Sequence, residues 1–154
     1  RRAFFELGDK LLSQSRRRAA PVALMMFDLD HFKAINDELG HKAGDDVLRS
    51  VAGIFTREVR AADVAARLGG EEFVVLLADT DTDEAMQFAQ RLLRTFEDGP
   101  GRTTGGAARV TASCGIASLP DFAGDLAELL RNADKAMYRA KLNGRNRVEV
   151  YSGP

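Results

Sequence analysis

Apolar residues recur at helical spacing in several stretches of the chain, with polar residues at the positions between them. This period predicts amphipathic helices that each bury one face against a shared core. Asp81 and Glu84, three residues apart, have the form of a capping box at the start of one helix. Gly40 and Gly44 predict breaks between the second and third helices. The helices are expected over residues 4–18, 32–39, 47–55, 81–96 and 125–142.

Shorter runs between the helices have the pattern of strands. Residues 22–27 are continuously apolar, which is typical of a strand covered on both faces. Two further runs, 64–68 and 73–78, flank the dipeptide Gly69-Gly70. A Gly-Gly pair between two such runs favours a tight β-hairpin.

The C-terminal half adds two more strands and a loop. Residues 110–116 alternate between apolar and polar, as in a half-exposed strand, and 148–150 form a last short strand. Residues 98–108 are rich in glycine and polar residues, which predicts a mobile loop. Helices around one central mixed, mainly antiparallel sheet indicate an α+β fold, with residues 1–154 as a single domain.

Composition narrows the classes of function. The formal net charge of the 154 residues is −1, so there is no overall basic field and no nucleic-acid partner is expected. Cys114 is the single cysteine, which excludes an internal disulfide and agrees with a cytoplasmic location. No apolar run reaches the roughly 18–20 residues of a membrane span, so direct membrane contact is not expected.

Acidic residues gather at two places that a mixed sheet can bring together. Asp28 and Asp30 directly follow the apolar run, and Glu71 and Glu72 lie on the predicted hairpin. Carboxylates brought together without a cation repel, and one of them takes up a proton. Mg²⁺ favours one or two protein carboxylates together with waters and phosphate oxygens, so this acidic set is a candidate magnesium site. The plainer alternative is a helix cap, which Asp30 is expected to provide.

Phosphate groups near these carboxylates would need N–H or cationic donors. The start of the helix after Asp30 offers free N–H groups and a favourable dipole, with Lys33 in its first turn. Lys141 and Arg145 bracket the end of a later helix. From spacing alone, these two residues either contact phosphate or only stabilise the helix dipole.

Five blocks of residues follow one another along nearly the whole chain. They are Asp28 to Lys33 with Asn36-Asp37, Gly40 to Asp45, Arg67 to Phe73, Ala133 to Lys141, and Gly144 to Val148. A lone Gly-Gly-Glu-Glu-Phe is a weak signal, because Gly-Gly hairpins are common. The five blocks in this order resemble the GGDEF family of diguanylate cyclases.

The resemblance implies a fold similar to class III nucleotide cyclases and polymerase palm domains. It implies that Asp28 and Glu71 hold the metal together with the backbone carbonyl of Leu29, with two Mg²⁺ ions per site or Mn²⁺ in their place. Asp28, Glu71 and Glu72 are the expected catalytic residues. The role of Glu72 stays open between metal binding, deprotonation of a 3′-hydroxyl and bracing of the turn.

The resemblance also implies GTP as the substrate. Asn36 and Asp45 would recognise the guanine edge, since an ionised Asp accepts hydrogen bonds from guanine N1–H and the 2-amino group. Adenine lacks that pair of donors, so Asp45 disfavours ATP. The other expected substrate-binding residues are Phe32, Lys33, Gly69, Gly70, Lys141 and Arg145.

In such a family the reaction takes place between two copies of the domain. Each copy binds one GTP, and each 3′-hydroxyl attacks the α-phosphate of the other GTP, giving cyclic di-GMP and two pyrophosphates. The family's usual lead-in before Arg1 is missing, so the chain is expected to be a fragment of a longer, regulated bacterial protein, which can be membrane-anchored. The alternative is a catalytically silent module that binds GTP or cyclic di-GMP and signals by protein contact.

A second site is expected from Arg60 and Asp63, which precede Gly69 at a fixed offset. In the family, an Arg-x-x-Asp at this offset resembles the inhibitory site for cyclic di-GMP. Arginine offers a bidentate fork to phosphate or a guanine edge. Arg91 on the next helix is expected to complete the site. The alternative is a surface ion pair that contributes almost nothing to stability.

Overall fold

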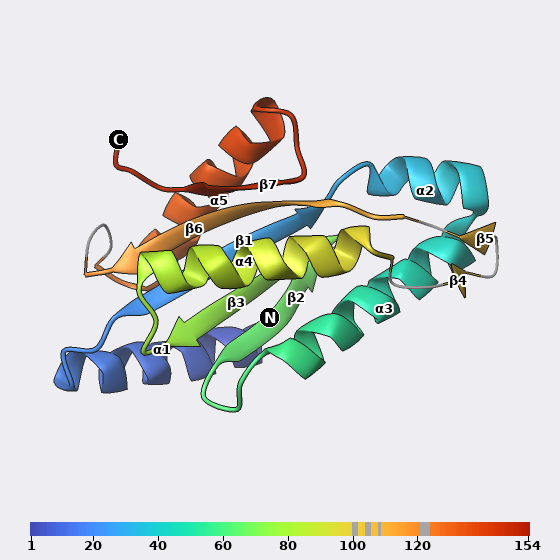
Figure 1. The fold of residues 1–154 in the computed structure, drawn as a ribbon. Coiled ribbons are helices and arrows are strands. Elements are labelled where there is room, and N and C mark those ends of the chain that lie inside the picture. The colour runs from blue at the N-terminus through green and yellow to red at the C-terminus, as the bar shows by residue number, and fades with distance from the viewer. Residues whose placement is uncertain (100–101, 104–105, 108, 121–123) are drawn as a thin grey trace.

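The computed structural model describes residues 1–99, 102–103, 106–107, 109–120 and 124–154. In this part of the chain, helices cover both faces of a five-stranded sheet (Figure 1). The strands, in their order across the sheet, are β2 (Val64–Gly69), β3 (Glu72–Ala78), β1 (Val22–Leu29), β6 (Ala112–Leu119) and β7 (Arg147–Val150). The helices are α1 (Arg2–Arg17), α2 (Phe32–Leu39), α3 (His41–Glu58), α4 (Thr82–Glu97) and α5 (Leu126–Leu142).

The central strand is β1, and every one of its residues is buried. It pairs antiparallel with β3 on one side and with β6 on the other. At the sheet edges, β2 is antiparallel to β3, whereas β7 is parallel to β6. The predicted α+β fold with a mixed, mainly antiparallel sheet is confirmed.

Alternate residues of β1 enter two separate cores. Met25 and Phe27 pack with residues of α3 and α4, whereas Leu24 and Met26 pack with residues of α1 and α5. Since successive strand residues point to opposite faces, Asp28 belongs to the face covered by α1 and α5. The alternation therefore decides which helix can supply a partner to Asp28.

The packing of α5 on this face is close. A Cβ at Gly115 of β6 would lie 2.1 Å from the carbonyl oxygen of Ala133 and 2.2 Å from the backbone nitrogen of Met137. Only glycine lets the helix backbone approach the strand to this distance. This contact holds the middle of α5 close against β6.

The break expected at Gly44 is wrong, because Gly44 lies inside the first turns of α3. Gly40 does separate α2 from α3, with φ of +91°. A Cβ on Gly44 would meet the side-chain oxygen of Asn36 at 1.8 Å. Gly44 thus lies where α2 packs closely on α3, and a side chain at this position would have to displace that of Asn36.

The half-exposed strand expected over residues 110–116 is also wrong. Strand β6 begins at Ala112, and all its residues except the last are buried. Its polar members have partners: the hydroxyl of Ser113 donates to Asp30 at 2.7 Å, and that of Ser118 lies 2.6 Å from the hydroxyl of Thr82. Hydrogen-bonded hydroxyls can be buried at little cost, so alternation with serine did not indicate exposure.

The loop expected over residues 98–108 is described only in part. The pairs Arg102–Thr103 (β4) and Gly106–Ala107 (β5) form a short antiparallel ladder, whereas residues 100–101, 104–105 and 108 lie outside the described residues. No helix within the described ranges has both the length and the apolar character needed to cross a membrane.

Candidate active site

The β2–β3 hairpin and the end of β1 lie at the same end of the sheet (Figure 1). Asp28 and Glu72 are direct cross-strand partners. Just beyond them, the backbone N–H of Leu29 donates to the carbonyl oxygen of Glu71 at 3.2 Å. The two acidic motifs, more than forty residues apart in the sequence, therefore meet at one place.

The hairpin turn is open on its outer side. Gly70 has φ of +51°, a left-handed conformation that favours glycine, whereas a Cβ on either Gly69 or Gly70 would meet no atom within 4 Å. The turn needs glycine for its backbone conformation at Gly70 and leaves free space beside the carboxylates.

The last turns of α5 supply a cation to this site. The ammonium group of Lys141 donates to Oδ2 of Asp28 at 2.7 Å. The Asp28 side chain is 10% exposed and that of Lys141 is 31% exposed, so the pair is largely shielded from water. The structure thus brings together two predicted site residues that are 113 positions apart.

The pKa of Glu72 is raised above its usual value, first by burial and next by the negative charge of Asp28. Asp134 and Glu71 add to the shift in the same direction, while Lys141 opposes it. Burial and the neighbouring carboxylates together therefore outweigh the effect of Lys141 on the pKa of Glu72.

This donor set fits Mg²⁺. Asp28 and Glu71, together with the carbonyl oxygen of Leu29, offer only oxygen ligands, which a hard cation prefers. No cluster of three or more His, Cys, Asp or Glu side chains suited to a metal occurs in the described part of the chain. A sparse oxygen set suits Mg²⁺, which keeps waters and phosphate oxygens among its ligands.

The two predicted guanine-recognition residues lie close to each other on α2 and α3. The side-chain oxygen of Asn36 packs against Gly44, the residue before Asp45. Asp45 is exposed and lines a cavity of about 230 Å³ with Arg49 of α3 and Arg67 of β2. This cavity lies between α3 and the strand that leads into the hairpin.

The other predicted substrate residues differ in exposure. Phe32 is only 8% exposed and belongs to the core that faces α3, so its visible role is packing. Lys33 is exposed in the first turn of α2. Arg145 is exposed as well, with φ of +63°, and its backbone N–H closes the end of α5 on the carbonyl of Ala140.

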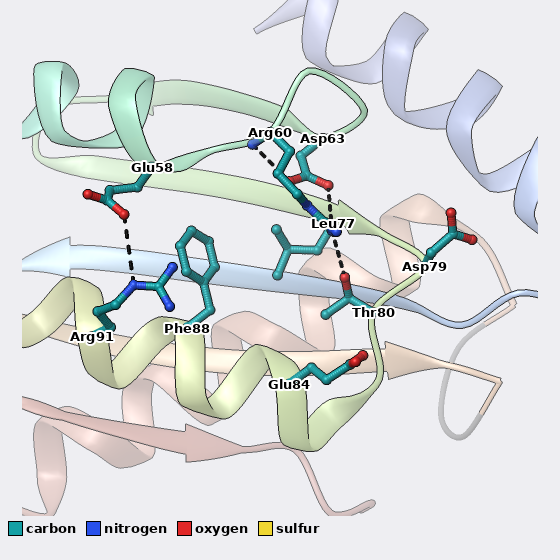
Figure 2. A pocket seen from close by; sticks show the side chains of 9 residues that line it. All are labelled: Glu58, Arg60, Asp63, Leu77, Asp79, Thr80, Glu84, Phe88 and Arg91. Atoms are coloured by element: carbon teal, nitrogen blue, oxygen red, sulfur yellow. Dashed lines mark hydrogen bonds and ion pairs between the residues drawn. The ribbon is translucent and has the colours of Figure 1, made fainter.

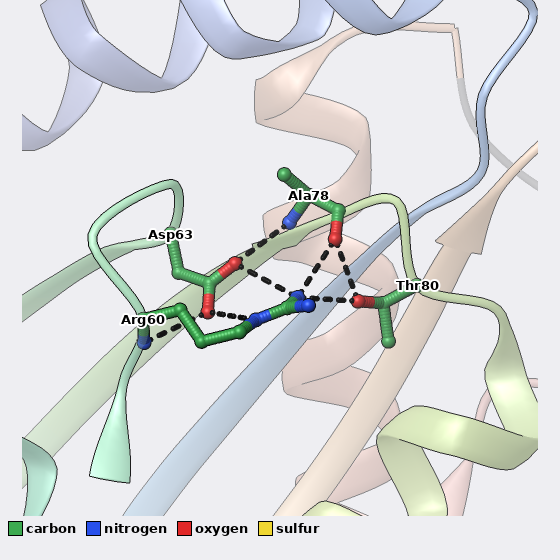
Figure 3. A network of polar contacts seen from close by, with 4 residues as sticks. All are labelled: Arg60, Asp63, Ala78 and Thr80. Carbon is green, nitrogen blue, oxygen red and sulfur yellow. Dashed lines mark hydrogen bonds and ion pairs between the residues drawn. The ribbon is translucent and has the colours of Figure 1, made fainter.

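At the opposite end of the sheet, Arg60 and Asp63 form a closed network with the end of β3 (Figure 3). The two Asp63 oxygens accept from the backbone N–H, Nε and Nη2 of Arg60 and from the backbone N–H of Ala78, at 3.0–3.2 Å. Nη2 of Arg60 also donates to the carbonyl of Ala78 at 2.9 Å and to the hydroxyl of Thr80 at 3.0 Å. The Asp63 side chain is 1% exposed, whereas that of Arg60 is 60% exposed.

Arg60, Asp63 and Arg91 line one cavity of about 260 Å³, shown in Figure 2. The guanidinium of Arg91 lies 4.9 Å from the ring centre of Phe88 and 3.8 Å from the carboxylate of Glu58. The residues predicted for the second site therefore share a hollow, with Arg91 reaching it from α4.

Comparison with known sequences identifies the family of this chain. The family profile described as "Diguanylate cyclase, GGDEF domain" matches residues 1–147. The chain belongs to the GGDEF domain family. Diguanylate cyclase A of Treponema denticola is 41% identical to this GGDEF domain over 139 residues, which are 90% of this chain and 38% of that protein. The cyclic di-GMP phosphodiesterase NbdA of Pseudomonas aeruginosa is 39% identical over 152 residues, which are 99% of this chain and 19% of that protein.

Solved GGDEF domains share the fold. The active GGEEF domain of a diguanylate cyclase from Vibrio cholerae has a TM-score of 0.91 and 30% identity, with 100% of this chain and 97% of that chain covered. The GGDEF domain of DgcB from Caulobacter crescentus, solved in complex with c-di-GMP, has a TM-score of 0.92 and 28% identity, covering 99% and 91% of the two chains.

Asp30 does not cap α2 in this GGDEF domain, so that expectation is wrong. The capping position is held by His31, which has φ of +53° and makes no side-chain cap bond. Asp30 instead accepts from the hydroxyls of Thr111 and Ser113, both at 2.7 Å, and from the backbone N–H of Asn146 at 3.0 Å. It ties the ends of β1 and α5 to the start of β6. Sequence reasoning missed these three partners, of which only Asn146 lies in a recognised motif.

Proposed function

We propose that this GGDEF domain joins two GTP molecules into cyclic di-GMP with release of two pyrophosphates. The observation that carries the proposal is the meeting of Asp28, Glu71 and Glu72 beside the cavity lined by Asp45. The similarity to a protein named diguanylate cyclase over 90% of this chain supports it.

In this proposal Asp28, Glu71 and the carbonyl of Leu29 hold Mg²⁺. The metal, when bound, neutralises charge on the reacting phosphoryl oxygens. The raised pKa of Glu72 makes this carboxylate the better candidate to accept the proton of the attacking 3′-hydroxyl. Lys141 holds Asp28 in place and lies where a triphosphate would approach the carboxylates.

Guanine is recognised by Asn36 and Asp45, which offer complementary acceptors to its N1–H and 2-amino donors. Lys33 and Arg145 are exposed and free to turn toward the triphosphate. Catalysis rests mainly on holding the reacting groups in line and stabilising the developing charge.

The reaction requires two copies of the domain, since one site holds one GTP. In each of two equivalent steps a 3′-oxygen bonds to the α-phosphorus of the facing GTP, the bond to the bridging oxygen breaks, and pyrophosphate leaves with its electron pair. We propose residues 1–154 as one catalytic domain, acting in the cytoplasm, of a longer regulated protein. The chain spans well under half the length of the relatives above.

Feedback by the product is the second part of the proposal. The cavity shared by Arg60, Asp63 and Arg91 offers two guanidinium groups to phosphate or guanine edges. A related domain solved in complex with c-di-GMP supports recognition of this dinucleotide within the family.

A second candidate function is a silent module that binds nucleotide and signals by contact. It is favoured by NbdA, in which a segment similar to this whole chain belongs to a protein named for cyclic di-GMP hydrolysis. The acidic set at Asp28, Glu71 and Glu72 favours the active cyclase, because a module that only binds does not need this cluster of like charges.

The test is synthesis of cyclic di-GMP by the purified domain, alone and fused to a dimerising partner, with GTP and Mg²⁺ and chromatographic detection of nucleotides. We expect product from the fused domain and a loss of about 10³-fold or more in Glu71→Gln, which removes a charged metal ligand but keeps its shape. Glu6→Gln, on the exposed surface of α1, is the matched control and should keep wild-type turnover.

GTP binding without product from the dimerised wild-type domain would refute the cyclase and support the silent module. Appreciable turnover in a folded Glu71→Gln domain would show that the metal assignment is wrong.

A further inference from the structure

Arg67 lies at the point where the β2–β3 ladder changes register. Pairing runs in step from Val64 with Leu76 to Arg67 with Phe73, and then shifts so that Gly69 faces Glu72. Such a bulge interrupts the backbone hydrogen bonds of a ladder. The interruption falls directly before the turn that carries the acidic residues.

The side chain of Arg67 bridges this turn. Its Nε donates to the carbonyl oxygen of Gly70 at 2.8 Å. From the other direction, the N–H of Leu29 donates to the next carbonyl oxygen, that of Glu71, at 3.2 Å. Two consecutive peptide groups are thus held from two sides, and the Cα of Glu71 lies between them in the chain.

No neighbouring strand supports the hairpin on the outer side of β2, which is an edge strand of the described sheet. The side chain of Arg67 therefore supplies a hydrogen bond of the kind that a neighbouring strand supplies in the interior of a sheet. The planar guanidinium suits this task, because its donors keep a fixed geometry.

Arg67 also lines the cavity that contains Asp45. Arg49 lines the same cavity, but its side chain is 79% exposed and contacts Asp46 at 3.4 Å. Of these two arginines, Arg67 is the one that links the cavity wall to the turn. Arg49 is for that reason a natural control.

We propose that Arg67 is a positioning residue, which holds the carbonyl of Gly70 so that Glu71 stands beside Asp28 before metal and substrate bind. The same side chain ties the turn to the wall of the guanine cavity. Its catalytic consequence rests on the proposed function, whereas its effect on the hairpin does not. A misplacement of about 1 Å in a catalytic group is enough to cost about 100-fold in rate.

The test compares Arg67→Ala, Arg67→Lys and Arg49→Ala in the purified domain, with thermal unfolding to confirm that each variant is folded. Amide hydrogen exchange of the metal-free protein is followed at Leu29 and Glu72, whose amides border the turn. We expect exchange about tenfold faster in Arg67→Ala, partial recovery in Arg67→Lys, which keeps one donor, and no change in Arg49→Ala.

Steady-state kinetics on the dimerised domain give the second readout. We expect kcat to fall by about 30-fold in Arg67→Ala, with KM for GTP within about threefold of wild type. Wild-type exchange at Leu29 and Glu72 in Arg67→Ala would overturn the proposal. So would a raised KM with unchanged kcat, because Arg67 would then bind substrate directly. If the wild-type domain made no product, the proposed function would fail, and the exchange data would still decide the role of Arg67.

Discussion

The two ends of the sheet each carry a buried aspartate beside a basic side chain, but the two pairs are built differently. At one end, the oxygens of Asp63 accept four hydrogen bonds, from Arg60 and from the backbone of Ala78. At the other end, Asp28 meets the single ammonium of Lys141 and faces Glu72 across the strand pair.

We call the Asp63 end of the sheet the finished end, because protein groups satisfy its carboxylate, and the Asp28 end the unfinished end. The Asp63 network is satisfied by protein groups and holds Arg60 in place, which would lower the cost of binding at the proposed product site. At the Asp28 end, burial and next the charge of Asp28 raise the pKa of Glu72, and Lys141 opposes this shift only in part. A further cation beside these carboxylates would relieve their mutual repulsion, which is the part that the metal takes in the proposed function.

The same isosteric change at both ends tests most directly whether the two aspartates contribute differently to stability. In Asp63→Asn an amide NH₂ replaces one acceptor and confronts a donor of Arg60 or Ala78, which should lower the free energy of unfolding by about 2–3 kcal/mol. Asp28→Asn removes the repulsion with Glu72, and its amide oxygen can still accept a hydrogen bond from the partly exposed Lys141, so the change should stay within about 1 kcal/mol. Urea unfolding in metal-free buffer measures both values. Equal losses would show that the two ends do not differ in this way.

Local patterns made much of the fold predictable. The capping box of Asp81 and Glu84 is present at the start of α4, and the Gly69-Gly70 hairpin joins β2 to β3 as expected. Each of these features is decided by residues within a few positions of one another. The meeting of the acidic motifs followed from the family pattern and from the position of β1 between two strands.

Contacts between distant segments were not predictable. Lys141 contacts Asp28 and Asn146 contacts Asp30, in each case across more than 110 residues of the chain. No local sequence pattern predicts either contact. A break was predicted at Gly44 because the sequence does not reveal that Asn36, on a neighbouring helix, packs against this position. Ser113 of β6 was predicted to be exposed because its buried partner, Asp30, lies elsewhere in the chain.

A smaller effect is expected from Arg91, which faces the finished end. Its side chain is 57% exposed and its ion pair to Glu58 spans 3.8 Å, so Arg91→Ala should change stability by no more than about 0.5 kcal/mol. The affinity for cyclic di-GMP should still fall by about tenfold, because one guanidinium group that could bind the ligand is lost. Isothermal titration calorimetry measures this affinity. Arg94→Ala, on the same helix but lining a different cavity, is the control and should bind normally.

Undiminished product affinity in Arg91→Ala would remove this residue from the second site and leave Arg60 and Asp63 to be tested alone. Arg60→Ala is harder to interpret, because it also removes two hydrogen-bond donors from the buried carboxylate of Asp63.

The smallest expected effect is at the unfinished end, in the pH dependence of Glu72→Gln. The folded state raises the pKa of Glu72, so the folded protein binds a proton more readily than the unfolded chain. The stability linked to this group is present below the ordinary glutamate pKa and is lost as pH rises through the raised value. Glu72→Gln lacks that loss and should therefore be the more stable protein at neutral pH. Because Glu72 is partly solvated, the gain should stay below about 1 kcal/mol, and it should vanish near about pH 4.

Urea unfolding of both proteins between about pH 4 and pH 8 gives the two curves. Parallel curves over this range would show that folding does not raise the pKa of Glu72, and the contrast between the two ends would then rest on hydrogen bonding alone.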